Sequence, residues 1–112
     1  MSREEILSTE YSKDFDKLRQ DMMAMSYYKY GPVKENAESG LSDFTKSLDI
    51  RYEAFKKTKN TEYLADIANL CMMIWMYPEC FGCHYKPTDS KESPGIDGTT
   101  VKALKEWDEY HG

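Results

Sequence analysis

Apolar residues recur at helical spacing in four stretches of the chain, and no stretch shows a convincing strand pattern. The first stretch begins at Ser12, a favourable N-cap residue, and ends before Gly31-Pro32. Its apolar residues are Phe15, Leu18, Met22, Met25 and Tyr28. The second stretch covers about 41–58, and its apolar residues are Leu41, Phe44, Leu48, Tyr52 and Phe55. Each stretch predicts an α-helix.

The third and fourth stretches complete a predicted helical bundle. A helix is expected over 61–78, and the short turn Lys59-Asn60 before it predicts an antiparallel hairpin with the second helix. Segment 79–98 is rich in Pro, Gly, Ser and Asp, which predicts a long loop of a kind that is often functional. A short amphipathic helix follows over 99–110, with Val101, Leu104 and Trp107 on one face. The expected fold is a single all-α domain over 1–112, a compact bundle of about four helices with its core over 12–78.

A line of polar residues interrupts the otherwise apolar third helix. Glu62, Asp66 and Asn69 are spaced i, i+4 and i+7, so they share one face. A helix this apolar is expected to lie inside the domain, where a carboxylate is costly unless it is paired or holds a cation. The line therefore indicates either a buried polar network or part of a metal or substrate site.

The hairpin brings further carboxylates close to this line. Residues equally distant from the turn lie at the same height, which sets Glu53 level with Asp66 and Asp49 level with Asn69. One hypothesis is a Mg²⁺ site, because Mg²⁺ prefers oxygen ligands and is often bound by carboxylates and substrate phosphates together. Its protein ligands would be Asp49, Glu53, Glu62 and Asp66. Lys46, Arg51 or Lys56 could then contact phosphate oxygens. The alternative is a set of solvated surface ion pairs, with Glu62 simply favourable in the first turn of its helix.

Composition and charge narrow the possible partners. The net charge of −5 argues against general binding to nucleic acid, which needs clustered Lys and Arg. No run of 18 uncharged apolar residues is present, and the N-terminus is too polar and acidic for a signal peptide, so a cytoplasmic location without membrane contact is expected. Nine tyrosines slightly favour a dimer or another partner surface.

Cys80, Cys83 and His84 form a CxxCH motif, the attachment sequence of c-type haem. Haem is not expected here, because covalent attachment normally follows export. Zinc would need His111 or Cys71 as a fourth ligand, and a redox pair would need a strand followed by a helix. We therefore expect two ordinary loop cysteines and a histidine, and we expect Cys71 to be a small core residue.

Three elements follow one another in this sequence: a Tyr-Gly pair, an amphipathic helix that ends in a basic hairpin, and a helix with the pattern E-x-L-x-D-hydrophobic-A-N. The residues concerned are Tyr30, Gly31, Glu62, Leu64, Asp66, Ala68 and Asn69. In this layout, residues 28–76 resemble small phage and bacterial proteins related to the MazG-like superfamily of all-α NTP pyrophosphohydrolases. The resemblance implies a helical core, usually dimeric, in which carboxylates of two helices hold Mg²⁺. It also implies hydrolysis of nucleoside triphosphates to monophosphates and pyrophosphate.

The carboxylate signature of that superfamily is ExxE on one helix and ExxD on the next. Here Glu35 and Glu38 form an ExxE between Pro32 and Gly40, and Asp49 with Glu53 is an alternative first pair at a four-residue step. The second element, from Glu62 to Asp66, is one residue longer than the pattern.

The expected function is binding of a nucleotide or phosphorylated small molecule, with Mg²⁺-dependent NTP or dNTP pyrophosphohydrolysis as its catalytic form. Glu53 and Asp66 would then be catalytic, and Lys46, Arg51 and Asn69 would bind substrate. The alternative is a small acidic phage or prophage protein without catalysis. Such a protein would inhibit a host defence protein or sequester a nucleotide signal in the host cytoplasm.

Overall fold

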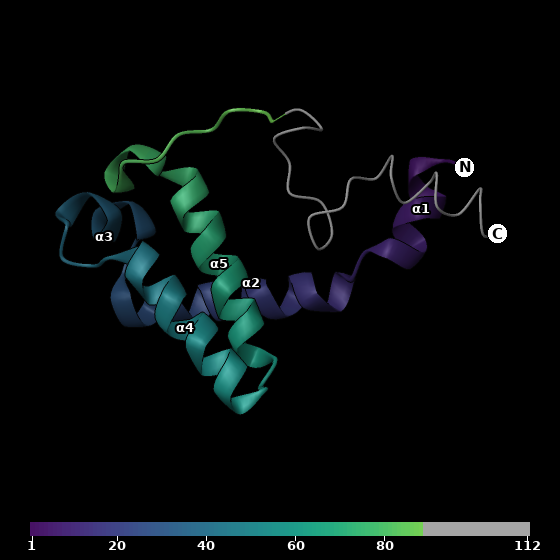
Figure 1. Ribbon diagram of the computed structural model, residues 1–112, viewed down its shortest axis with the longest axis horizontal. Coiled ribbons are helices and arrows are strands. Elements are labelled where there is room, and N and C mark those ends of the chain that lie inside the picture. Colours follow the sequence, from purple (N-terminus) through teal and green to yellow (C-terminus); the bar gives the residue numbers. More distant parts are fainter. Residues whose placement is uncertain (89–112) are drawn as a thin grey trace.

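The computed structural model describes residues 1–88, which form five α-helices and one 3₁₀ turn and contain no β-strand (Figure 1). The elements are α1 Arg3–Glu10, α2 Lys13–Tyr30, α3 Val33–Ser39, α4 Phe44–Thr58, α5 Glu62–Met76 and η1 Pro78–Phe81. The expected all-α fold is confirmed. The expected helix over 99–110 and the second half of the expected loop lie outside the described residues. Within the described part, no helix is long and apolar enough to cross a membrane.

The boundaries of α2 follow the local signals in the sequence. The Ser12 hydroxyl accepts a hydrogen bond from the Phe15 backbone N–H at 3.0 Å, which caps the helix N-terminus. At the other end, the Gly31 N–H donates to the Tyr27 carbonyl oxygen at 2.9 Å. Gly31 has φ +79°, a conformation that L side chains rarely adopt. The chain therefore turns out of α2 at the position that only glycine accommodates without strain.

Two helices were not expected from the sequence. In α1, Ser2 and Glu5 form a reciprocal capping box. In α3, the helix follows directly on Pro32 and ends at Gly40, which is in the left-handed conformation. Neither helix exceeds eight residues, so neither is long enough to show a clear apolar period.

The α4–α5 hairpin is the centre of the bundle, and α2 packs against α5 (Figure 1). The hairpin turn includes Lys59, which adopts a left-handed conformation and caps α4 through its N–H to the Phe55 carbonyl. The core beside it is small and centres on Phe44, with Ala37 and Leu70. The Phe44 ring lies 5.0 Å from the Phe81 ring, so η1 closes the end of the core.

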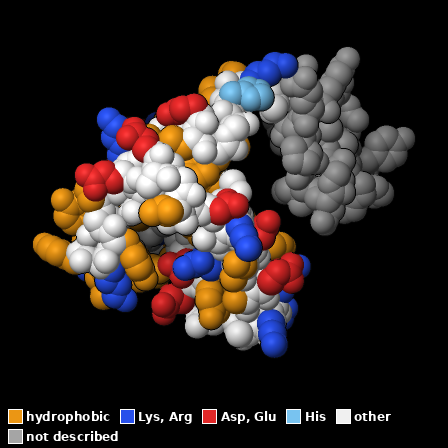
Figure 2. Space-filling model, turned by 90° about the vertical axis from the view of Figure 1, so that its left-hand side faces the viewer, with side chains coloured by type: hydrophobic (Ala, Val, Ile, Leu, Met, Phe, Trp, Pro, Cys, Tyr) orange, Lys and Arg blue, Asp and Glu red, His pale blue; other side chains and the backbone are white. Residues whose placement is uncertain are grey.

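Much of the apolar surface remains outside this core. On the face seen in Figure 2, hydrophobic side chains reach the surface among charged ones. On α4, Phe44 is buried, but Tyr52 is 49% exposed, and Leu41 precedes the helix and is 92% exposed. The expectation that the third predicted helix lies wholly inside was wrong for one side of α5, where Cys71 is exposed and Trp75 is 67% exposed.

Helix α2 packs on the bundle through its more polar side. Its partly buried residues, apart from Met22, are Asp16, Arg19, Met23 and Ser26, which recur at helical spacing. The stripe of apolar residues lies about 100° further round the helix. Three of its members are exposed by 38%, 42% and 62%, namely Phe15, Leu18 and Met25.

Candidate functional site

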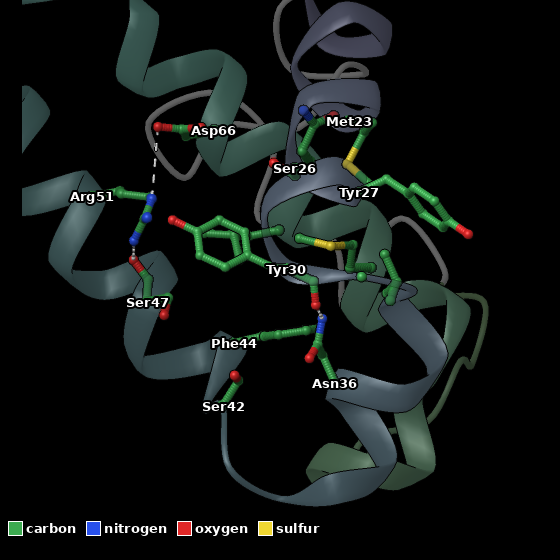
Figure 3. Close-up of a pocket in the computed structure, with 15 residues that line it drawn as sticks. Met23, Ser26, Tyr27, Tyr30, Asn36, Ser42, Phe44, Ser47, Arg51 and Asp66 are labelled. Carbon is green, nitrogen blue, oxygen red and sulfur yellow. Dashed lines mark hydrogen bonds and ion pairs between the residues drawn. The ribbon is translucent and has the colours of Figure 1, made fainter.

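A cavity of about 380 Å³ opens between α2, α3, α4 and α5 (Figure 3). One part of its lining is aromatic and apolar, formed by Met23, Tyr27, Tyr30, Val33, Phe44, Leu70 and Met73. The other part is polar, formed by Ser26, Asn36, Ser42, Ser47, Arg51, Asp66 and Asn69. The volume and this mixed lining are typical of a small-molecule site.

The charged end of the cavity is an ion pair between the two hairpin helices. Arg51 Nε lies 3.7 Å from Asp66 Oδ2, and the two side chains are 40% and 35% exposed. A second nitrogen of the same guanidinium, Nη1, donates to the Ser47 carbonyl oxygen at 3.4 Å. The Tyr30 side chain points toward Arg51 from the opposite side (Figure 3). Arg51 is the one Lys or Arg side chain among the described residues that line this cavity.

The turn between α2 and α3 positions the aromatic side of the cavity. The Asn36 side-chain amide donates to the Tyr30 carbonyl oxygen at 2.9 Å, which ties α3 to the end of α2. Gly31, also in the lining, reverses the chain direction immediately afterwards. Tyr30 is 71% exposed, whereas Phe44, which also lines the cavity, is buried. The cavity therefore combines a fixed aromatic base with an accessible aromatic side chain at its edge.

The polar line of α5 divides between two neighbouring helices. Asp66 pairs with Arg51 on α4, whereas Asn69 is 5% exposed and donates through Nδ2 to the Arg19 carbonyl oxygen on α2 at 3.1 Å. The Asn69 Oδ1 atom is buried and has no hydrogen-bond partner among the described residues. Glu62 is exposed in the first turn, where its N–H bonds the Asn60 side chain. Asn69 thus joins α5 to α2 as well as lining the cavity.

The structure does not bring the four predicted metal ligands together. Asp49 and Glu53 lie on the exposed side of α4, and Glu53 Oε1 pairs with Lys56 Nζ at 2.7 Å. This hydrogen bond raises the pKa of Lys56. Within residues 1–88, no three His, Cys, Asp or Glu side chains form a group that could hold a metal ion. The described residues therefore do not bring these four carboxylates to one point, and the Mg²⁺ site stays a prediction from the sequence.

The remaining predicted residues lie elsewhere. Lys46 is exposed and is not in the cavity lining. Cys80 is partly buried against the core, Cys83 is exposed, and both are free thiols, as is Cys71. The expectation that Cys71 is a core residue was wrong, because it faces outward from α5. His84 is exposed in the chain that follows η1.

Of the residues predicted from the sequence, Arg51, Asp66 and Asn69 line the cavity, whereas the aromatic lining was not predicted. A signal was present, since Tyr27 and Tyr30 fall in a run of tyrosines just before the Gly-Pro helix stop.

Comparison of the chain with protein-family models, characterised proteins and solved structures gives no match. The resemblance to MazG-like proteins accordingly stays a prediction that rests on the sequence motif.

Proposed function

We propose that this protein binds a nucleotide or a closely related phosphorylated small molecule in the cavity between α2, α3, α4 and α5. The observation that carries the proposal is the presence of one accessible guanidinium, Arg51, opposite an aromatic lining in the same cavity. A nucleotide has the matching combination of a flat ring and an anionic group.

Each part of the ligand has a suitable contact. A guanidinium donates two parallel hydrogen bonds to phosphate oxygens, which gives both affinity and orientation. The exposed Tyr30 side chain at the edge of the cavity favours stacking on a nucleobase, which contributes about 1–3 kcal/mol per base. The Ser26, Ser47 and Asn36 side chains also line the cavity and supply groups that can hydrogen-bond a sugar or a base edge.

Binding, rather than hydrolysis, is the function that the geometry supports best. Pyrophosphohydrolysis with Mg²⁺ would need several carboxylates around the metal, and Asp66 is the one carboxylate among the described residues that line the cavity. Asp66 is also paired with Arg51. The catalytic roles of Glu53 and Asp66 therefore remain predictions from the sequence, and no reaction step is assigned to them.

Isothermal titration calorimetry with a panel of nucleoside mono-, di- and triphosphates, with and without Mg²⁺, tests the proposal. We expect a dissociation constant in the micromolar range or below for at least one nucleotide. Replacing Arg51 by Met should weaken binding by about 10- to 100-fold, because a charged hydrogen-bonding group contributes about 1.5–3 kcal/mol. The matched control is Lys57→Met, which removes one positive charge from an exposed position on the same helix.

Two results would contradict the proposal. One is the absence of heat and of any rise in melting temperature with every nucleotide, which would favour the interaction-protein alternative. The other is equal weakening by Arg51→Met and Lys57→Met, which would indicate general electrostatic attraction rather than a site. Pyrophosphate release measured on the same panel then distinguishes hydrolysis from simple binding.

A further inference from the structure

The outward-facing side of α2 carries an apolar stripe that follows a heptad pattern. Its residues are Phe15, Leu18, Met22 and Met25, spaced alternately three and four apart. This spacing keeps apolar side chains along a single seam, and it is the pattern by which one helix packs against another. We call these four residues the α2 seam.

Among the described residues, the bundle leaves Phe15, Leu18 and Met25 of the α2 seam exposed, and Met22 is partly buried. The residues of α2 that approach α5 lie on a different side of the helix. There the Arg19 carbonyl oxygen accepts a hydrogen bond from the Asn69 side chain. The N-terminal part of α2, together with α1, projects beyond the α4–α5 hairpin (Figure 1). On α1, Ile6 and Leu7 are also exposed, by 44% and 38%. An amphipathic helix that packs through its polar side leaves its apolar side available to another helix.

We propose that the α2 seam is a homodimer interface, occupied by the α2 seam of a second copy of this chain. A seam that packs on its own copy about a two-fold axis needs no other partner, because both copies bury the same residues at once. The flank of the seam suits this pairing. Lys17 and Asp21 form an ion pair there at 3.6 Å, so these two charges offset each other.

The exposed apolar area is sufficient for a stable dimer. Ile6, Leu7, Phe15, Leu18 and Met25 are between 38% and 62% exposed. With about 200 Å² for each large side chain, they present roughly 450 Å² of apolar surface. A standard interface buries about 800 Å² per partner, of which slightly more than half is apolar. The seam and α1 together supply that apolar share.

A second copy of α2 matches the α2 seam in length and spacing. The seam extends about 15 Å along the helix from Phe15 to Met25, and the second copy supplies a stripe of the same extent.

Analytical ultracentrifugation of the full chain, from about 1 to 100 µM, tests the proposal. The wild-type protein should approach twice its chain mass of 13.1 kDa. Met25→Glu places a charge in the seam and should raise the dimer dissociation constant by at least about 100-fold. Ala24→Glu is the matched control: it adds the same charge one residue away, at an exposed position about 140° from the centre of the seam, and should leave the dimer intact.

Leu18→Glu provides a second disruption at a different point of the seam, and far-UV circular dichroism shows whether each variant keeps its helices. A wild-type protein of single-chain mass throughout the range would overturn the proposal. So would a dimer that Met25→Glu leaves unchanged, or one that Ala24→Glu disrupts as strongly. A helical monomer for both seam variants, beside a dimeric Ala24→Glu, would support it.

Discussion

The ion pair at the charged end of the cavity predicts that removing one of its charges strengthens nucleotide binding. Asp66 is the carboxylate that faces Arg51, with 3.7 Å between Oδ2 and Nε. If Arg51 binds a phosphate directly, the Asp66 carboxylate repels that phosphate and competes for the guanidinium. Replacing Asp66 by Asn keeps the size and a hydrogen-bonding side chain but removes the negative charge. The variant should therefore bind an anionic nucleotide more tightly than the wild-type protein in the absence of Mg²⁺.

The size of the effect follows from Coulomb's law. A phosphate on Arg51 would lie on the order of 6 Å from the Asp66 carboxylate, and at an effective dielectric constant between those of a protein surface and water the repulsion is about 1 kcal/mol. This corresponds to a dissociation constant lowered by about fivefold. The effect on folding should be small, because ion pairs as exposed as this one contribute about 0–1 kcal/mol.

Calorimetric titrations with and without Mg²⁺ distinguish this prediction from the metal-ligand hypothesis. If Asp66 holds Mg²⁺ for the nucleotide, Asp66→Asn should weaken binding in the presence of Mg²⁺, and Asp49→Asn should weaken it as well. If Arg51 binds the phosphate without metal, Asp66→Asn should tighten binding, and Asp49→Asn should have little effect, because Asp49 is exposed and screened by salt. Weaker metal-free binding by Asp66→Asn would refute the electrostatic argument.

Three further predictions concern the scaffold that holds the cavity. Phe44→Ala should lower the free energy of unfolding by about 3–5 kcal/mol, measured by urea denaturation, because Phe44 is 8% exposed and stacks on Phe81; a loss below about 1 kcal/mol would mean that the core lies elsewhere. Gly31→Ala should cost about 1–3 kcal/mol at φ +79° and ψ −168°, whereas Gly40→Asn, at φ +70° and ψ 3°, should be tolerated better in the same assay. Hydrogen bonds from the Thr45 hydroxyl and then from the Lys46 N–H lower the pKa of Asp43. The Asp43 carboxylate should therefore stabilise the fold above its ordinary pKa, and this stabilisation should disappear as the pH falls through the lowered pKa. Acid unfolding of wild type and Asp43→Asn, followed by circular dichroism, checks this: a variant with the same acid-dependent loss as wild type would contradict it.

The predicted helices that rest on local signals agree with the structure. The helix from Ser12 to Gly31 has the expected cap and stop, because a capping hydroxyl and a glycine at positive φ act within a few residues of the chain. The hairpin also follows from local information, since a turn of a few residues leaves two helices no other arrangement. The sequence likewise pointed to Arg51, Asp66 and Asn69, which all lie in the cavity lining.

The tertiary structure alone decided which faces meet. The turn between two helices determines which of their residues lie opposite each other. Here Lys59 in the turn adopts the left-handed conformation, Asp66 pairs with Arg51, and Glu53 points outward. The rotation of α2 is likewise a long-range property: Asn69 binds the Arg19 carbonyl group on its polar side, and the apolar stripe remains outside. An apolar period in the sequence shows that a helix has a face to bury. Only the packing of distant segments determines whether this face is buried within the same chain.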